Sequence, residues 1–215
     1  MKTTFLKIAT VLLILTAGTK TFAANPGSNQ ELTELTWINK FYKIEVHGNV
    51  RLHLLSGEKN GVQMSGTYYD HDALVEIENG VLRITCYSAE RLDVWVTVYD
   101  LNALTAYDDV LVKTEGRFSS LDLDIELYDK AKADLNLDCC FIHIKLNDSS
   151  LANISGTAIE SELAVNYAST LNSTNFIAAQ MLKKRMDPAQ RMPVEFNTNF
   201  YNKDNTITES AVNNG

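Results

Sequence analysis

The sequence predicts an all-β protein whose short strands coil into a solenoid with a period of 19–21 residues. Apolar and polar residues alternate through most of the chain, as in strands with one buried face, and Leu121–Leu127 (LDLDIEL) is the clearest example. Apolar residues also recur at matching positions in successive repeats. No proline occurs between Pro26 and Pro188, so every backbone amide in that stretch is available for strand pairing.

The first 23 residues have the pattern of a secretory signal peptide. Lys2 and Lys7 precede a short apolar run over residues 8–15, and small residues follow around Ala23. The run is shorter than the roughly 20 residues that a transmembrane helix needs, and a buried N-terminal helix is the alternative. We therefore expect cleavage after Ala23, an exported chain without a membrane span, and a polar linker over residues 24–36.

From residue 37 onward, short alternating segments follow one another as predicted strands. They cover residues 44–46, 50–54, 75–77, 82–84, 92–98, 121–127 and 142–146. Asn79-Gly80 predicts a tight hairpin turn between two of them, because both residues tolerate a positive φ. No stretch between residues 40 and 175 has the apolar spacing of an amphipathic helix.

Four polar turns mark the repeats: residues 107–109 (YDD), 128–130 (YDK), 147–149 (NDS) and 166–168 (NYA), at spacings of 21, 19 and 19 residues. In this register the apolar columns are Leu104/Ile125/Ile144/Leu163, Ala106/Leu127/Leu146/Val165, Val112/Ala133/Ala152/Leu171 and, more weakly, Thr114/Leu135/Ile154/Ser173. One coil cannot bury its apolar side alone, so the coils are expected to stack. A β-sandwich, the main rival, would also alternate but would not predict columns at a fixed register.

Outward residues of neighbouring coils are complementary in charge. The predicted pairs are Glu126/Lys145, Asp124/His143 and Lys113/Asp134. Stacked strands lie about 4.8 Å apart, so these opposite charges should meet along the stack. The whole chain is acidic, with 27 Asp and Glu against 19 Lys and Arg, which argues against a generic nucleic-acid binder.

Residues 41–50 (FYKIEVHGNV) and 74–84 (LVEIENGVLRI) carry two further patterns. They are similar to the F-x-x-I-x-V-x-G-x-x-V start and the V-x-N-G-x-L-x-I hairpin of the head GIN domain family of auto-transporter adhesins, and the resemblance extends to about Phe176. It implies a right-handed, mainly single-stranded β-helix in an exported, Bacteroidetes-type envelope protein with an adhesin-like role. The family's turns commonly read Ser-Gly-Ala, whereas the turns here carry Tyr, Asn and Asp.

Asp108, Asp129 and Asp148 fall in one column at the turns. Three carboxylates about 5 Å apart repel one another unless something compensates. A calcium ion, which prefers several oxygen ligands, is one candidate. The other is that each carboxylate accepts hydrogen bonds from its own turn. We favour the second and expect no cofactor, with calcium as the alternative.

No catalytic motif stands out in the sequence. It has no Gly-x-Ser-x-Gly motif, and its four histidines, which we expect at the surface, lack the spacing of metal ligands. Pectin-degrading enzymes share the β-helix and use clustered acids, so Asp122, Asp124 and Glu126 form a candidate row. The opposite charges predicted beside Asp124 and Glu126 favour a solvated ionic ladder instead.

Aromatic side chains are the better candidates for binding. Trp95 and Tyr99 lie on the polar face of their strand, and Tyr107 and Tyr128 are predicted to stack in adjacent coils. Aromatic rings on an outer surface hold sugars or protein partners, although they also cover the edges of a solenoid. We therefore name Trp95, Tyr99, Tyr107 and Tyr128 as candidate binding residues.

The cysteines and the C-terminus complete the predictions. We expect buried thiols, with a disulfide from Cys86 to Cys139 or Cys140 as the alternative. Residues 177–191 predict a short helix that caps the open end of the solenoid, within a cap and tail over 177–215.

These features predict an exported, non-enzymatic β-solenoid over residues 37–176 that binds a protein or glycan at the cell surface, as an adhesin does. A polysaccharide-binding or pectinase-like protein and a structural envelope protein without a small ligand are the alternatives. The periplasm, the outer-membrane surface and secretion all remain open as the destination, and so does self-association.

Overall fold

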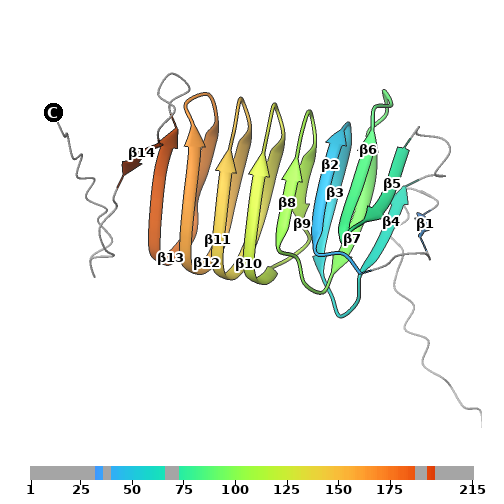
Figure 1. Ribbon diagram of the computed structural model, residues 1–215, viewed down its shortest axis with the longest axis horizontal. Helices are drawn as coiled ribbons and strands as arrows, with labels where there is room; N and C mark the ends of the chain where they lie inside the picture. Colours follow the sequence, from blue (N-terminus) through green and yellow to red (C-terminus); the bar gives the residue numbers. More distant parts are fainter. Residues whose placement is uncertain (1–31, 36–39, 66–72, 187–192, 197–215) are drawn as a thin grey trace, which may run out of the picture.

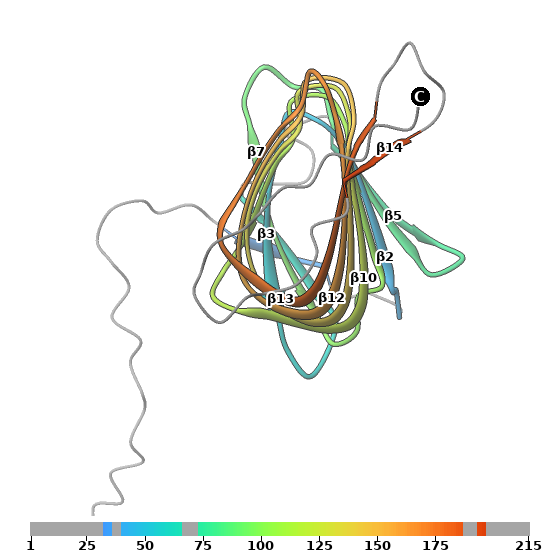
Figure 2. The ribbon, with the colours of Figure 1, turned by 90° about the vertical axis from the view of Figure 1, so that its left-hand side faces the viewer.

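In the computed structural model, the described residues are 32–35, 40–65, 73–186 and 193–196. Within these ranges every helix or strand element is a strand, and all fourteen strands join one sheet, so the all-β prediction is confirmed. The strands are β1 (Leu32–Glu34), β2 (Lys43–Gly48), β3 (Val50–Ser56), β4 (Gly61–Ser65), β5 (Ala73–Glu78), β6 (Val81–Cys86), β7 (Leu92–Val98), β8 (Ala103–Ala106), β9 (Leu111–Thr114), β10 (Phe118–Leu127), β11 (Lys132–Leu146), β12 (Leu151–Asn166), β13 (Thr170–Met186) and β14 (Pro193–Phe196). Figure 1 shows them side by side along the long axis, and Figure 2 shows them overlying one another end-on.

The strands from β8 to β12 pair in parallel at the offsets expected from the sequence. Leu104 lies opposite Ile125 at an offset of 21 residues, and Ile125, Ile144 and Leu163 follow at offsets of 19. The first three predicted apolar columns, which are Leu104/Ile125/Ile144/Leu163, Ala106/Leu127/Leu146/Val165 and Val112/Ala133/Ala152/Leu171, are confirmed. The chain reverses at the turns predicted over 107–109, 128–130 and 147–149, on what we call the turn side. Each long strand bends midway on the opposite side, which we call the bend side (Figure 1).

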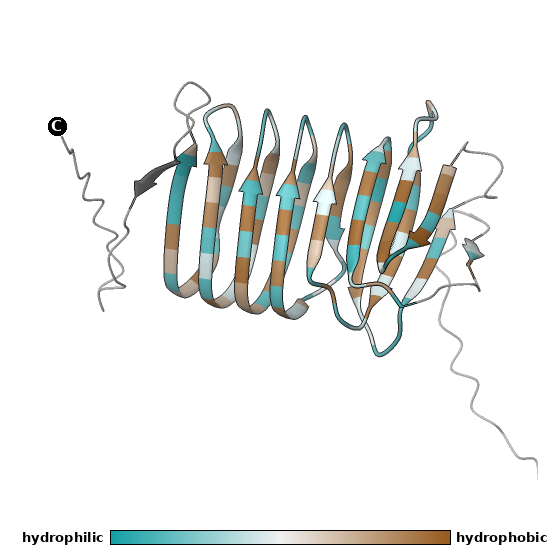
Figure 3. Ribbon diagram, in the orientation of Figure 1, coloured by the Kyte–Doolittle hydropathy of each residue, from teal (hydrophilic) through white to brown (hydrophobic). Residues whose placement is uncertain are grey.

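The core runs along the inside of this stack. Alternate residues of each strand point inward, so the apolar columns are buried, with Ile44, Ile84, Ile144 and Leu163 fully so. Figure 3 shows the same alternation as bands of apolar and polar residues across successive strands. Polar side chains therefore face outward at regular positions on neighbouring strands.

The fourth predicted column is only partly correct. Leu135 lies opposite Ile154, but Ser173 does not continue the column, because the pairing shifts between Asn153 and Ser155. This β-bulge displaces the second half of β13 by one residue. As a result, Lys183 and Arg185 lie opposite the buried Leu163 and Val165, and charged residues end the apolar columns here.

The helix predicted over residues 177–191 is wrong for residues 177–186, which belong to β13. This segment pairs with β12 almost along its whole length, and such pairing outweighs a local spacing that suits a helix. β14 then pairs antiparallel with Lys183–Met186. Residues 187–191 lie outside the described residues.

The N-terminal strands do not stack in chain order. β2 and β3 lie directly against β8 and β9, while β6 and β7, which come later in the chain, lie on the outer side of β2 and β3. β5 and β4 pair antiparallel with β6 and β7. The predicted hairpin turn between β5 and β6 is confirmed, with φ of 51° at Asn79 and 78° at Gly80.

The alternative of a disulfide from Cys86 is wrong, since all three cysteines are thiols. Cys86 ends β6 on the turn side, whereas Cys139 and Cys140 lie at the bend of β11. The predicted signal peptide lies outside the described residues. Within the predicted linker, Leu32–Glu34 forms β1 and pairs with β4. No helix in the described part of the chain is long and apolar enough to cross a membrane.

Candidate functional site

The three aspartates of the turn side are linked by hydrogen bonds between coils. Asp108, Asp129 and Asp148 have φ of 58°, 56° and 55°, a left-handed conformation that Asp tolerates better than most residues. The backbone N–H of Asp129 donates to the Asp148 carboxylate at 3.1 Å, that of Asp108 to Asp129 at 3.2 Å, and that of Gly48 to Asp108 at 2.9 Å. These bonds run to the neighbouring coil rather than within the same turn, as we had expected. Nowhere in the described ranges do three or more His, Cys, Asp or Glu side chains gather to hold a metal ion.

Beside the aspartates, three aromatic rings form a continuous stack. Tyr107 and Tyr128 stack as predicted, with centroids 4.9 Å apart, and His47 stacks on the other face of Tyr107 at 4.3 Å. The Tyr128 hydroxyl donates to Glu126, which is the main reason why the pKa of Tyr128 is raised, and burial adds to the effect. Both faces of Tyr107 are therefore covered, and its ring offers a ligand only its edge.

Trp95 is covered in a similar way by a histidine that the sequence led us to expect at the surface. The ring of His53 lies 4.7 Å from that of Trp95, and the His53 side chain is only 14% exposed. The His53 ring nitrogens lie 2.7 Å from Glu115 and 3.3 Å from Asp93. The hydrogen bond from His53 is the largest cause that lowers the pKa of Glu115. This cluster ties β7, β3 and β9 together.

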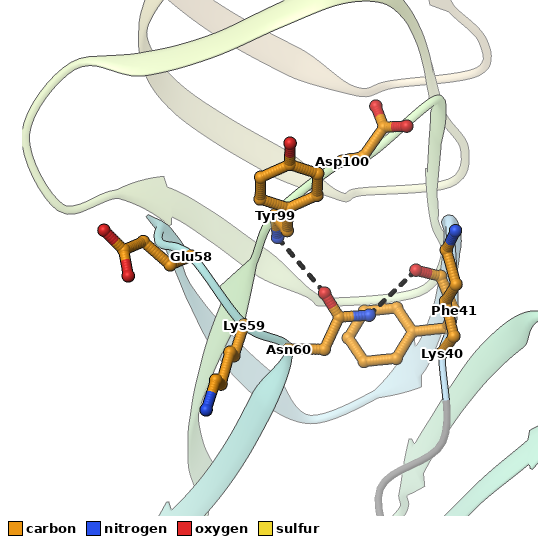
Figure 4. A pocket seen from close by; sticks show the side chains of 7 residues that line it. All are labelled: Lys40, Phe41, Glu58, Lys59, Asn60, Tyr99 and Asp100. Carbon is orange, nitrogen blue, oxygen red and sulfur yellow. Dashed lines mark hydrogen bonds between the residues drawn. The ribbon is translucent and has the colours of Figure 1, made fainter.

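Tyr99, the fourth predicted aromatic residue, is different because its side chain is open. It is 72% exposed and lines an open hollow of about 370 Å³ on the bend side (Figure 4). Three segments meet there: the residues before β2, the loop between β3 and β4, and the residues after β7. The lining residues are Lys40, Phe41, Glu58, Lys59, Asn60, Tyr99 and Asp100.

Asn60 holds this hollow together. Its Nδ2 donates to the carbonyl of Phe41 at 2.9 Å, and its Oδ1 accepts the backbone N–H of Tyr99 at 3.1 Å (Figure 4). The carboxamide therefore joins all three segments and fixes the backbone that carries the Tyr99 ring. The sequence gave no sign of Asn60, because nothing in it reveals that the end of β7 lies beside the loop after β3.

The four predicted aromatic residues are thus not brought to one place. Tyr107 and Tyr128 lie on the turn side, Trp95 lies within β7, and Tyr99 follows β7 on the bend side. They belong to three separate surfaces, of which the one around Tyr99 includes a hollow.

The acidic row of β10 is largely answered by its neighbours, as predicted. Asp124 lies 3.5 Å from His143, and Glu126 lies 4.0 Å from Lys145. Asp122 is exposed opposite Phe141. The row has the contacts of an ionic ladder on a solvated face.

The sequence reading missed one exposed apolar surface. Leu121, Phe141, Ile159 and Ile177 are all exposed at the bends of β10 to β13. We call these four residues the bend stripe. The regular alternation breaks where each strand bends, so sequence periodicity does not show which way these side chains point.

Known structures share this fold at low sequence identity. A "putative adhesin" from Bacteroides fragilis has a TM-score of 0.63 and 14% identity, over 75% of this chain and 78% of that one. A "putative adhesin" from Parabacteroides distasonis has a TM-score of 0.54 and 16% identity, over 74% and 80%. A "putative lipid binding protein" from the same species has a TM-score of 0.56 and 12% identity, over 71% and 77%.

No curated protein matches the chain. The family described as "Putative auto-transporter adhesin, head GIN domain" matches residues 40–182, a span that holds β2 to β12, most of β13 and all the surfaces described above. This match covers well over half of the chain and agrees with the resemblance seen at residues 41–50 and 74–84, so the chain belongs to the head GIN domain family of adhesins.

Proposed function

We propose that this chain is an exported, adhesin-like protein of the cell envelope that binds a surface molecule and catalyses no reaction. The observation that carries the proposal is the exposed Tyr99 ring beside a hollow whose backbone Asn60 fixes. A rigid aromatic ring at a concave site is a common anchor for a partner. Trp95, Tyr107 and Tyr128 contribute ring edges elsewhere on the outer surface.

The proposed scaffold is a right-handed, mainly single-stranded β-helix with a period of 19–21 residues, over residues 37–176. The constant offsets between parallel strands support this description, and so does the family to which the chain belongs. In the same proposal, residues 1–23 are a signal peptide, residues 24–36 lead into the helix, and residues 177–215 form its cap and tail. Export takes the chain to the periplasm, the outer-membrane surface or the medium.

In this proposal the aspartate column is structural and holds no calcium. The hydrogen bonds that Asp108, Asp129 and Asp148 accept from neighbouring backbones support this role. Each bond places an N–H dipole against a carboxylate and so offsets part of the repulsion within the column.

Binding of a polysaccharide is the second candidate, and the Tyr99 ring beside polar side chains favours it. A pectinase-like reaction has weaker support, because Asp124 and Glu126 already face His143 and Lys145.

The test measures binding of the purified chain to intact bacterial cells and to isolated envelopes. We expect the wild type to bind and Tyr99→Ala to bind much more weakly. Tyr87→Ala is the matched control, because Tyr87 is 70% exposed but lies on the turn side. Equal binding of the wild type and Tyr99→Ala would remove Tyr99 from the site. Release of new reducing ends from envelope polysaccharide would contradict the non-enzymatic part.

A further inference from the structure

Most outer aromatic rings of the described residues already have a partner on at least one face. His47 and Tyr128 cover Tyr107, His53 covers Trp95, and the Arg185 guanidinium lies 5.2 Å from the centroid of Tyr167. For Tyr99, by contrast, no ring or cation contact is found within the described part of the chain, and the side chain is 72% exposed. Its ring faces are therefore available to a ligand.

The surroundings of this ring are those of a small polar site. The hollow of about 370 Å³ is at the lower end of the roughly 300–1,000 Å³ typical of small-molecule pockets. Its rim offers carboxylates as acceptors and ammonium groups as donors within reach of one ring (Figure 4). A hydroxyl group both donates and accepts, so a ligand rich in hydroxyls can use both kinds of group.

The charges around the hollow cancel. Lys40 and Lys59 carry two positive charges, and Glu58 and Asp100 carry two negative ones. The rim therefore gives no net attraction to a polyanion or to a polycation. Within a chain of net charge −8, an acidic polymer is disfavoured further.

We infer that the Tyr99 hollow binds one unit of a neutral sugar, with an apolar C–H face of the sugar ring against Tyr99 and its hydroxyls toward the charged rim. This inference rests on the proposed binding function and gives it a ligand class. It also separates the chain from pectin-type ligands, which carry a carboxylate on most of their rings.

The experiment titrates the full exported chain with neutral xylo-, cello-, manno- and galacto-oligosaccharides, and with polygalacturonate and chitosan as charged comparisons. We expect one neutral series to bind, with at least a tenfold loss of affinity in Tyr99→Ala and less than about a threefold loss in Tyr99→Phe, which keeps the ring. Tyr87→Ala should bind as the wild type does. Thermal melting of each variant shows whether it is folded.

Three outcomes would overturn the inference. The first is tighter binding of polygalacturonate or chitosan than of any neutral series. The second is binding of a neutral series that Tyr99→Ala does not weaken. The third is no binding of any neutral series by the folded wild type. If cells still bind the wild type but not Tyr99→Ala in that third case, the ligand class is wrong while the proposed binding function stands. If cell binding is also independent of Tyr99, both are wrong.

Discussion

Replacing Asp129 separates two contributions of the aspartate column to stability. Asp129 has a φ of 56°, and its carboxylate accepts the backbone N–H of Asp108 at 3.2 Å. Alanine removes the hydrogen bond and places an ordinary Cβ in the left-handed region. Glycine removes the hydrogen bond but suits the backbone, and asparagine keeps both an acceptor and a tolerance for this φ.

These differences set the expected order of stability. The left-handed conformation costs an ordinary residue about 1–2 kcal/mol, and a hydrogen bond at this exposed position contributes about 1 kcal/mol. Asp129→Ala should therefore lower the free energy of unfolding by about 2–3 kcal/mol, and Asp129→Gly by about 1 kcal/mol. Asp129→Asn should equal or slightly exceed the wild type at low salt, because it removes the central charge of three stacked carboxylates.

Urea unfolding of the four proteins, in excess calcium and in EDTA, measures this order. Equal losses in the alanine and glycine variants would show that the φ of Asp129 costs nothing, and the conformational part of the reasoning would fail. If calcium stabilises the wild type but not Asp129→Asn, the aspartate column is a cation site and the structural role is wrong.

Two further predictions concern titratable groups. Burial raises the pKa of Cys139 to about 11, so at mild pH a thiol reagent should label the half-exposed Cys140 quickly and Cys139 only after unfolding; fast labelling of both by mass spectrometry would contradict this. The hydrogen bond from His53 lowers the pKa of Glu115, so its stabilising contribution is full above the ordinary carboxyl pKa of about 4.3 and is lost as the pH falls through the lower folded value. His53→Phe, which keeps a ring beside Trp95, should flatten the pH dependence of unfolding below about pH 5, and an unchanged profile would show that the bond adds no stability.

The sequence was sufficient for the regular part of the fold because each repeat states the same pattern again. Ile125, Ile144 and Leu163 share a column with Leu104 since a one-residue slip would turn every inward side chain outward. The charge pairs Glu126/Lys145 and Asp124/His143 followed from the same register. The stacking of Tyr107 on Tyr128 followed for the same reason.

The rest depended on interactions that a period cannot reveal. A single-residue bulge in β13 places Lys183, rather than an apolar residue, opposite Leu163, and an inserted residue looks like any other in the sequence. The placement of β6 and β7 outside β2 and β3 depends on pairing between distant segments. The candidate site was therefore found only in part: Tyr99 was named, but Asn60 and the charged rim were not.

The difference between these two regions also explains where a binding site is expected. In the regular stack, an outward side chain has neighbours about 4.8 Å away on adjacent strands, so aromatic rings cover one another and opposite charges pair. Regularity thus uses up many of the groups that a ligand would need. The N-terminal coils break the repeat, because the end of β7 meets a loop from another coil instead of a copy of itself. Exposed ring faces and polar groups without a strand neighbour arise where the register ends, and the Tyr99 hollow lies at such a place.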